Sequence, residues 1–224
     1  LGIVGRAGAF ASHLSLPAGN FHAVPDAISD EAAVLVEPTA AACEILTQVD
    51  IGPRATVAVV GDGRMALLVG RVIRTTGATV TVLGKHDRKL QVAKDLGLTV
   101  GRSTDDIPTS SFDVTVDVTG HPAGLTRAIE LVRPRGTVVM KSTFHGETPV
   151  TLWPAIVDEN GCLRVTVLLT ATGATATERA PRPNSVKPTT VRTKKLHRSV
   201  SRSFWEIFSK LTLCLLNPTI VTRS

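Results

Sequence analysis

The stretch Ala55–Leu83, ATVAVVGDGRMALLVGRVIRTTGATVTVL, decides the fold of this chain. The apolar run Ala55–Val60 predicts a buried strand, which the glycines of the following GDG end. Apolar residues at helical spacing then continue to about Thr76, and Gly77 leads into a second apolar run. The order strand, tight turn, helix, turn, strand predicts a βαβ unit with two parallel strands.

The turn after the first strand has the pattern G-x-G-x-x-A. Gly61 permits the tight turn, Gly63 lets a phosphate approach the backbone, and Ala66 is small enough for the helix to pack on the strand. The first helical turn, which includes Arg64 and Met65, presents its N–H groups at the positive end of the helix dipole. This context predicts a pyrophosphate site of a dinucleotide-binding domain. The alternative is an α/β domain with a glycine-rich turn and no ligand.

Cofactor choice is expected to depend on the residues after the second strand. An NAD site usually has Asp or Glu there to bind the ribose 2′-hydroxyl, whereas this chain has Gly84. The cations Lys85, His86 and Arg88 follow it and would attract a 2′-phosphate. We therefore predict NADP, with NAD as the alternative. Asp87 argues against this choice, and a solvated helix start would also explain these charges.

The ends of two later predicted strands complete the expected site. Thr119-Gly120 follows a strand predicted over Asp113–Val118, and Lys141-Ser142-Thr143 ends a strand predicted from Gly136. In open parallel sheets, ligands lie beyond the carboxyl ends of the strands. We expect Thr119 and Gly120 to lie near the nicotinamide half of the cofactor. Strand-ending turns with no ligand explain these residues equally well.

The remaining pattern alternates helices with strands. Helical spacing covers Glu31–Val49, where Pro38 should kink or break the helix, and recurs near Arg88–Leu96 and Gly124–Val132. Alternation at this spacing predicts an α/β fold with a doubly wound, Rossmann-type parallel sheet. Two short strands are expected before it, over 8–17 and 21–25.

Composition sets limits on the class of protein. Hydrophobic residues make up 43% of the 224-residue chain, yet no apolar run approaches the ~20 residues of a membrane span. Three scattered cysteines cannot form a disulfide framework or a four-cysteine zinc site, so a cytoplasmic location is expected. Residues 1–159 hold 14 basic and 17 acidic residues, and residues 160–224 hold 11 and 2. The basic region, residues 160–224, is therefore expected to be a tail of low order.

Five segments together resemble the medium-chain, zinc-type alcohol dehydrogenases and reductases, in particular the alcohol, polyol and threonine dehydrogenase group. The segments are GAFASHLSLPAGNFHAVPD, EAAVLVEPTAAACEIL, VAVVGDGRMALLVGRV, VDVTGHP and LVRPRGTVVMKST. The resemblance covers about residues 1–159. It implies a remnant of a GroES-like catalytic domain over 1–26 and a Rossmann domain over 27–159, followed by the basic region.

The resemblance implies an oxidoreductase that transfers a hydride between NADP(H) and an alcohol or carbonyl substrate. In that family a catalytic zinc acts as a Lewis acid, and Glu37 matches one zinc-site position. A helix-start carboxylate is the alternative role for Glu37. No Cys precedes Cys43 and no Gly-His-Glu occurs, so the other zinc ligands are missing. His13 and His22 match no ligand position and are expected to have surface or packing roles.

These departures lead us to expect a fragment that is impaired or inactive as an enzyme. The catalytic residues and the substrate are unknown at this level, and the resemblance implies a homodimer through the cofactor domain. The change of composition after Glu159 suggests a frame change, an alternative exon or a wrong gene model. A different class is a non-catalytic dinucleotide-binding fragment whose basic region binds a polyanion or nucleic acid. No nucleic-acid motif accompanies that region.

Overall fold

The computed structural model describes residues 8–15 and 22–142, together with the backbone of three strands in the basic region. It divides into two units, Leu1–Leu35 and Val36–Ser224, which are described separately. The domain boundary expected near residue 26 stays a prediction. Within the described part, no helix is long and apolar enough to cross a membrane. The contacts that a polyanion would make with the basic region lie outside the described residues.

The first unit has little regular structure. Its helix α1 (Asp30–Ala33) begins after Ser29, whose hydroxyl accepts the N–H of Ala32. Residues 8–15 and 22–25 contain no strand, so the two predicted strands are wrong in these described parts. The physical reason is that an isolated strand leaves its N–H and C=O groups unpaired and needs neighbouring strands for stability.

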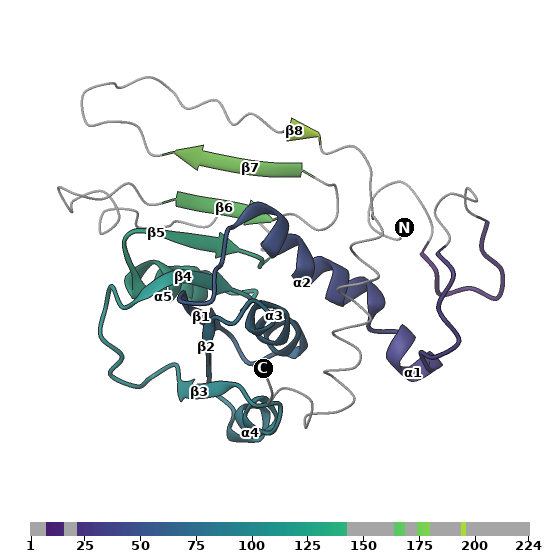
Figure 1. The fold of residues 1–224 in the computed structure, drawn as a ribbon, viewed down its shortest axis with the longest axis horizontal. Coiled ribbons are helices and arrows are strands. Elements are labelled where there is room, and N and C mark those ends of the chain that lie inside the picture. Colours follow the sequence, from purple (N-terminus) through teal and green to yellow (C-terminus); the bar gives the residue numbers. More distant parts are fainter. Residues whose placement is uncertain (1–7, 16–21, 143–163, 169–173, 180–193, 196–224) are drawn as a thin grey trace. The chain divides into compact units, whose positions relative to one another are not determined.

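A parallel sheet forms the centre of the second unit (Figure 1). Its first five strands are β1 (Thr56–Val60), β2 (Thr79–Gly84), β3 (Thr99–Arg102), β4 (Phe112–Asp117) and β5 (Val132–Met140). They lie in the order β3-β2-β1-β4-β5, and all pairs are parallel. The direction of winding reverses between β1 and β4, which confirms the predicted doubly wound sheet.

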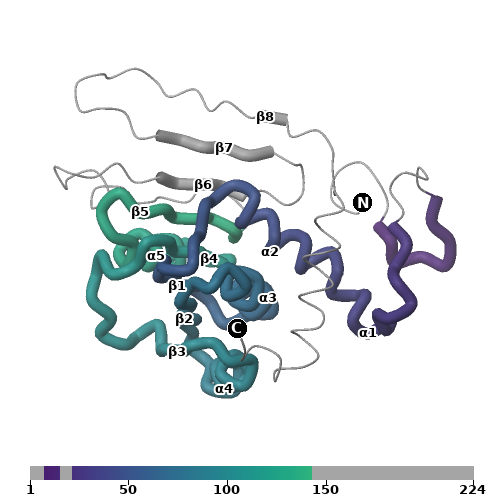
Figure 2. Tube along the Cα trace, viewed as in Figure 1, coloured from purple at the N-terminus to yellow at the C-terminus, as the bar shows by residue number. Residues whose placement is uncertain are grey.

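Four helices pack on this sheet. They are α2 (Val36–Gln48), α3 (Arg64–Arg74), α4 (Asp87–Asp95) and α5 (Pro122–Leu131). Alternate strand residues face opposite sides, so the core has two clusters. Val57 and Val59 of β1 join the cluster that includes α2 and α3, while Ala58 and Val60 join the cluster that includes α5. Figure 2 follows this chain from α2 to β5.

The helical stretch predicted over Glu31–Val49 is two helices, α1 and α2, with a break at residues 34 and 35. The break includes the residue four positions before Pro38, whose ring and missing N–H oppose a helical hydrogen bond there, so the predicted kink or break is confirmed. Pro38 itself lies in the first turn of α2, where a proline is tolerated. The basic region was expected to be a tail of low order, yet it contains β6 (Arg164–Leu168), β7 (Ala174–Arg179) and β8 (Lys194–Lys195).

These three strands extend the sheet beyond β5. Strand β6 pairs parallel with β5, and β7 and β8 follow as antiparallel neighbours. The free edge of β5 offers unpaired N–H and C=O groups, which another extended segment satisfies whatever its charge. Backbone pairing at a sheet edge is therefore a physical reason why a basic, Thr-rich stretch becomes strand.

Candidate functional site

A pocket of about 720 Å³ opens at the carboxyl ends of β1, β2 and β4. We call it the edge pocket; the turns after these strands and the start of α5 line it. Six residues predicted from the sequence line it: Gly61, Gly63, Gly84, Lys85, His86 and Thr119. The other predicted residues, Arg64, Met65, Ala66, Arg88 and Gly120, lie in adjacent elements and do not line it. The topology thus brings the glycine turn, the residues after β2 and Thr119 after β4 together at the carboxyl end of the sheet.

The glycine turn is built as the sequence predicts. Gly61 has φ +126°, in the region that favours glycine, and its N–H donates to the Leu83 carbonyl at 2.8 Å. A Cβ on Gly61 would meet Val118 at 3.1–3.3 Å. A Cβ on Gly63 would meet no protein atom within 4 Å and would enter the edge pocket. Gly63 thus leaves an open cradle of the kind that a pyrophosphate requires.

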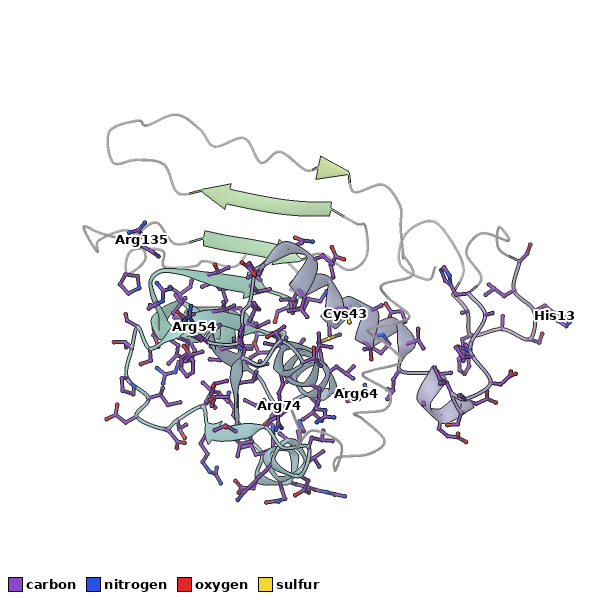
Figure 3. All side chains as sticks on the ribbon, viewed as in Figure 1. His13, Cys43, Arg54, Arg64, Arg74 and Arg135 are labelled. Atoms are coloured by element: carbon purple, nitrogen blue, oxygen red, sulfur yellow. The ribbon has the colours of Figure 1, made fainter. Side chains whose placement is uncertain are left out.

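Helix α3 begins at this cradle. Gly63 is its N-cap and provides no side-chain hydrogen bond to the first N–H groups, which therefore stay available to an anion. Arg64 is exposed at the start of α3 (Figure 3), and Met65 packs against the core. Ala66 is fully buried. The start of α3 thus offers backbone N–H donors, while Ala66 packs in the core.

The sequence pattern does not single out Asp62, which follows β1 and whose carboxylate lies beside the end of β2. Its Oδ2 accepts the backbone N–H groups of Lys85 and His86 and the ring Nδ1 of His86, all at 2.8 Å. Lys89 Nζ lies 3.4 Å from Oδ1. The parallel register of β1 and β2, with Val60 opposite Leu83, places the turn after β1 beside the end of β2. That register is the signal that could have identified Asp62.

Asp62 is ionised at neutral pH. Burial is the largest single effect and opposes ionisation, but the hydrogen bonds from His86, Lys85 and Lys89 together outweigh it and lower the pKa of Asp62 to about 2. Only 10% of the side chain is exposed. The edge pocket therefore carries a fixed negative charge among its cations.

The other charges near β2 have separate roles. Asp87, which argued against NADP, pairs with Arg102 and lies outside the edge pocket. Lys85 lines the pocket with an exposed side chain, and Arg88 is exposed on α4. His86 is the N-cap of α4 and bonds to Asp62. Asp62 thus offsets part of the positive charge expected here.

The end of β4 holds a second buried carboxylate. Asp117 is fully buried, and its Oδ1 accepts the N–H and the hydroxyl of Thr119 at 3.0 and 2.8 Å. Its Oδ2 has no hydrogen-bond partner among the described residues. Gly124 at the start of α5 packs against this pair, since a Cβ there would overlap Thr119 and lie 2.6 Å from Asp117 Oδ1. Asp117 and Gly124 together hold Thr119 at the pocket rim.

The end of β5 also carries polar groups. The Gly120 N–H donates to the Ser142 hydroxyl at 2.8 Å, which ties the turn after β4 to β5. Lys141 is 7% exposed, and its Nζ has no hydrogen-bond partner in the described part of the chain. Burial lowers the pKa of Lys141, while Glu44 and Glu37 of α2 act in the opposite direction. An unpaired buried amine is thus one feature of this end of the sheet.

The described residues do not fit a zinc site. Glu37 is exposed in the first turn of α2. No group of three or more His, Cys, Asp or Glu side chains among residues 8–15 and 22–142 could hold a metal ion. His13 and His22 are exposed, as expected for surface residues. Catalytic zinc needs about three protein ligands, so no chemical step is assigned to a metal here.

Comparison with known proteins defines the class. The family described as zinc-binding dehydrogenase matches residues 65–179, about half of this chain, and the chain belongs to that family. The match continues past residue 159, where the resemblance seen in the sequence was expected to stop. It thus includes the β6 and β7 segments of the basic region.

Among individual relatives, L-threonine 3-dehydrogenase of Legionella pneumophila (strain Corby) is 27% identical over 158 residues, covering 66% of this chain and 46% of the relative. The same enzyme of Idiomarina loihiensis is 29% identical over 150 residues, covering 61% and 43%. The chain thus spans about half the length of the curated relatives it matches.

Solved structures agree with this fold. The 2R,3R-butanediol dehydrogenase of Bacillus subtilis is 25% identical, with a TM-score of 0.59 over 66% of this chain and 44% of that one. A zinc-binding dehydrogenase of Sinorhizobium meliloti, solved bound to NADP, shares the fold with a TM-score of 0.58 at 21% identity, over 65% and 46%. The chain therefore has the Rossmann-type fold of medium-chain, alcohol dehydrogenase-like oxidoreductases.

Proposed function

We propose that this chain supplies the cofactor half of an oxidoreductase that transfers a hydride between NADP(H) and an alcohol or carbonyl substrate. The observation that carries the proposal is the open cradle at Gly63, placed at the start of α3 and inside the edge pocket. Membership of the zinc-binding dehydrogenase family supports the reaction class. L-threonine and 2R,3R-butanediol, named in two relatives, are alcohols.

In this proposal each part of the dinucleotide has its own set of residues. The N–H groups of α3 would hold the pyrophosphate, the end of β2 the adenosine, and the ends of β4 and β5 the nicotinamide. Lys85 and Arg88 supply positive charge for a 2′-phosphate, which favours NADP. Thr119 and Gly120 contact the nicotinamide side. When bound, the dinucleotide supplies the hydride acceptor or donor, and the protein positions and shields it.

The reaction needs more than these residues. No group of three or more His, Cys, Asp or Glu side chains among the described residues could hold a metal ion. No described side chain is assigned the role of proton donor. We therefore propose that the chain by itself binds cofactor and is impaired or inactive in hydride transfer. Three scattered cysteines support a cytoplasmic setting, and the family resemblance supports a homodimer formed through the cofactor domain.

The experiment compares two glycine substitutions in open space. Gly63→Ala places a methyl group in the cradle, so NADPH affinity should fall at least about tenfold while thermal stability stays unchanged. Gly52→Ala is the matched control, because a Cβ there also meets nothing within 4 Å but lies before the amino end of β1. Calorimetric titration and thermal melts measure both quantities. Wild-type affinity in Gly63→Ala, or no dinucleotide binding by the wild type, would contradict the proposal.

A further inference from the structure

The two carboxylate oxygens of Asp62 are unequal. Oδ2 accepts three short hydrogen bonds from the start of α4. Oδ1 receives one long contact, from Lys89 Nζ at 3.4 Å, and no short hydrogen bond from the described residues. Oδ2 therefore anchors the side chain, and Oδ1 keeps acceptor capacity. Asp62 itself lines the edge pocket.

Asp62 occupies the space that a residue at position 84 would otherwise fill. A Cβ on Gly84 would lie 2.5 Å from Asp62 Cβ and 2.8 Å from Asp62 Oδ2. In dinucleotide folds, an acid at the end of the second strand binds the ribose 2′-hydroxyl. Here an acid reaches the same place from the glycine turn, while position 84 itself has no side chain.

The pocket therefore offers two opposite features to the adenosine ribose. The free acceptor of Asp62 suits a hydroxyl, which can donate a proton, and repels a phosphate. Lys85 and Arg88 suit a phosphate, and neither forms an ion pair among the described residues. The ion pair with Asp62 also reduces the positive charge that Lys89 presents.

We propose that Asp62 binds the adenosine ribose hydroxyl through Oδ1, so that this site accepts NAD as well as NADP. The inference rests on the proposed dinucleotide function. It makes Asp62, and not a residue of β2, the specificity-determining acid of the chain. Both dinucleotides should bind the wild type with dissociation constants within about tenfold of each other.

The first test replaces the acid by its amide. In Asp62→Asn, the side-chain oxygen keeps accepting the N–H groups of Lys85 and His86, and the amide nitrogen turns a donor toward the pocket. NADH affinity should fall about tenfold, and NADPH affinity should stay or rise. Calorimetric titration of both dinucleotides measures the ratio, and a thermal melt checks folding.

The matched control is Asp87→Asn. It removes the same charge at the first residue of α4, from a carboxylate that pairs with Arg102 outside the edge pocket. The ratio of the two affinities should change by less than about twofold, because the loss is screened by solvent. Equal changes in both variants would mean that bulk charge sets the preference, and would overturn the assignment of Asp62.

A second test needs no substitution. The wild type should bind 2′-deoxy-NADH about tenfold more weakly than NADH, because the deoxy compound lacks the donor that Asp62 accepts. Equal affinity for the two would overturn the inference, as would an Asp62→Asn variant that weakens both dinucleotides equally. If the wild type binds no dinucleotide at all, the proposed function fails and this inference with it. If the wild type binds both dinucleotides but Asp62→Asn leaves the ratio of their affinities unchanged, the inference alone fails.

Discussion

Buried polar groups differ in hydrogen bonding between two parts of the sheet. They have partners at the carboxyl ends of β1 and β2, whereas some lack them at the carboxyl ends of β4 and β5. Beside β2, the carboxylate of Asp62 is held by two backbone N–H groups, an imidazole and an ammonium. Beside β4 and β5, Asp117 Oδ2 and Lys141 Nζ are buried without a hydrogen-bond partner among the described residues. All four strands belong to the same sheet, and their carboxyl ends lie on the same side of it.

The difference indicates how fully each part of the sheet satisfies its own buried polar groups. A buried polar atom without a partner costs about 1–3 kcal/mol, so such atoms persist where another role or another partner compensates. The β1–β2 end satisfies its own charges and should keep its geometry with or without a ligand. The β4–β5 end carries the unpaired groups and should respond more to what is bound beside it.

Gly124→Ala should give the largest loss of stability, because it damages the β4 end directly. A Cβ there overlaps the Thr119 side chain and crowds Asp117, so the loss should be about 3 kcal/mol although Ala normally favours a helix. Urea denaturation measures it. Adding Thr119→Ala should recover part of the loss, since it removes one of the two clashes. A stability equal to the wild type would show that this end rearranges freely.

Acid should remove a specific contribution from the β2 end. The pKa of Asp62 is about 2 in the folded protein and 3.8 without the fold, so the unfolded chain takes up the proton first as pH falls. The contribution is present above about pH 4 and is lost toward pH 2; it amounts to about 2 kcal/mol. Denaturation of the wild type and Asp62→Asn from pH 6 to pH 2 should show two curves that converge. A constant difference would contradict this account.

Lys141→Met should give the smallest change, a gain of about 1 kcal/mol at pH 7, because it removes an unpaired buried amine and keeps the side-chain length. Burial lowers the pKa of Lys141 in the folded protein, so the unfolded chain binds more protons between that lowered pKa and about 10.5. Wild-type stability should therefore rise with pH through that window, and the variant should lack the rise. Exposed Lys94→Met is the control in the same denaturation series. A loss of stability in Lys141→Met would show that the amine has a partner.

The sequence predicts the parts of this fold that depend on local pattern. The strand, glycine turn and helix of 55–83 follow from apolar periodicity and glycine placement, and α4 ends before Gly97, which has φ +76°, as expected. The strands β4 and β5 and the helix α5 lie within a few residues of the predicted bounds. Their apolar faces are long enough for the pattern to be clear.

Other features depend on contacts between distant segments. Strand β3 has only four residues, TVGR, and becomes strand because the free edge of β2 pairs with it. The sequence places Asp62 in a turn, but only the register of β1 against β2 brings it beside the end of β2. The expected strands before residue 26 fail for the converse reason, since no neighbouring strand pairs with the described segments there.

The facing positions 62 and 84 constrain how this site can change over evolutionary time. Because a side chain at 84 would collide with Asp62, the chain has room for one acid at the end of β2, carried by either position and not by both. Moving the acid from the turn to the strand takes two substitutions. Gly84→Asp made first is crowded, whereas Asp62→Gly made first passes through a form without any acid. Under the proposed role of Asp62, that intermediate would favour a phosphorylated cofactor, so the order of mutation would decide which dinucleotide is used on the way.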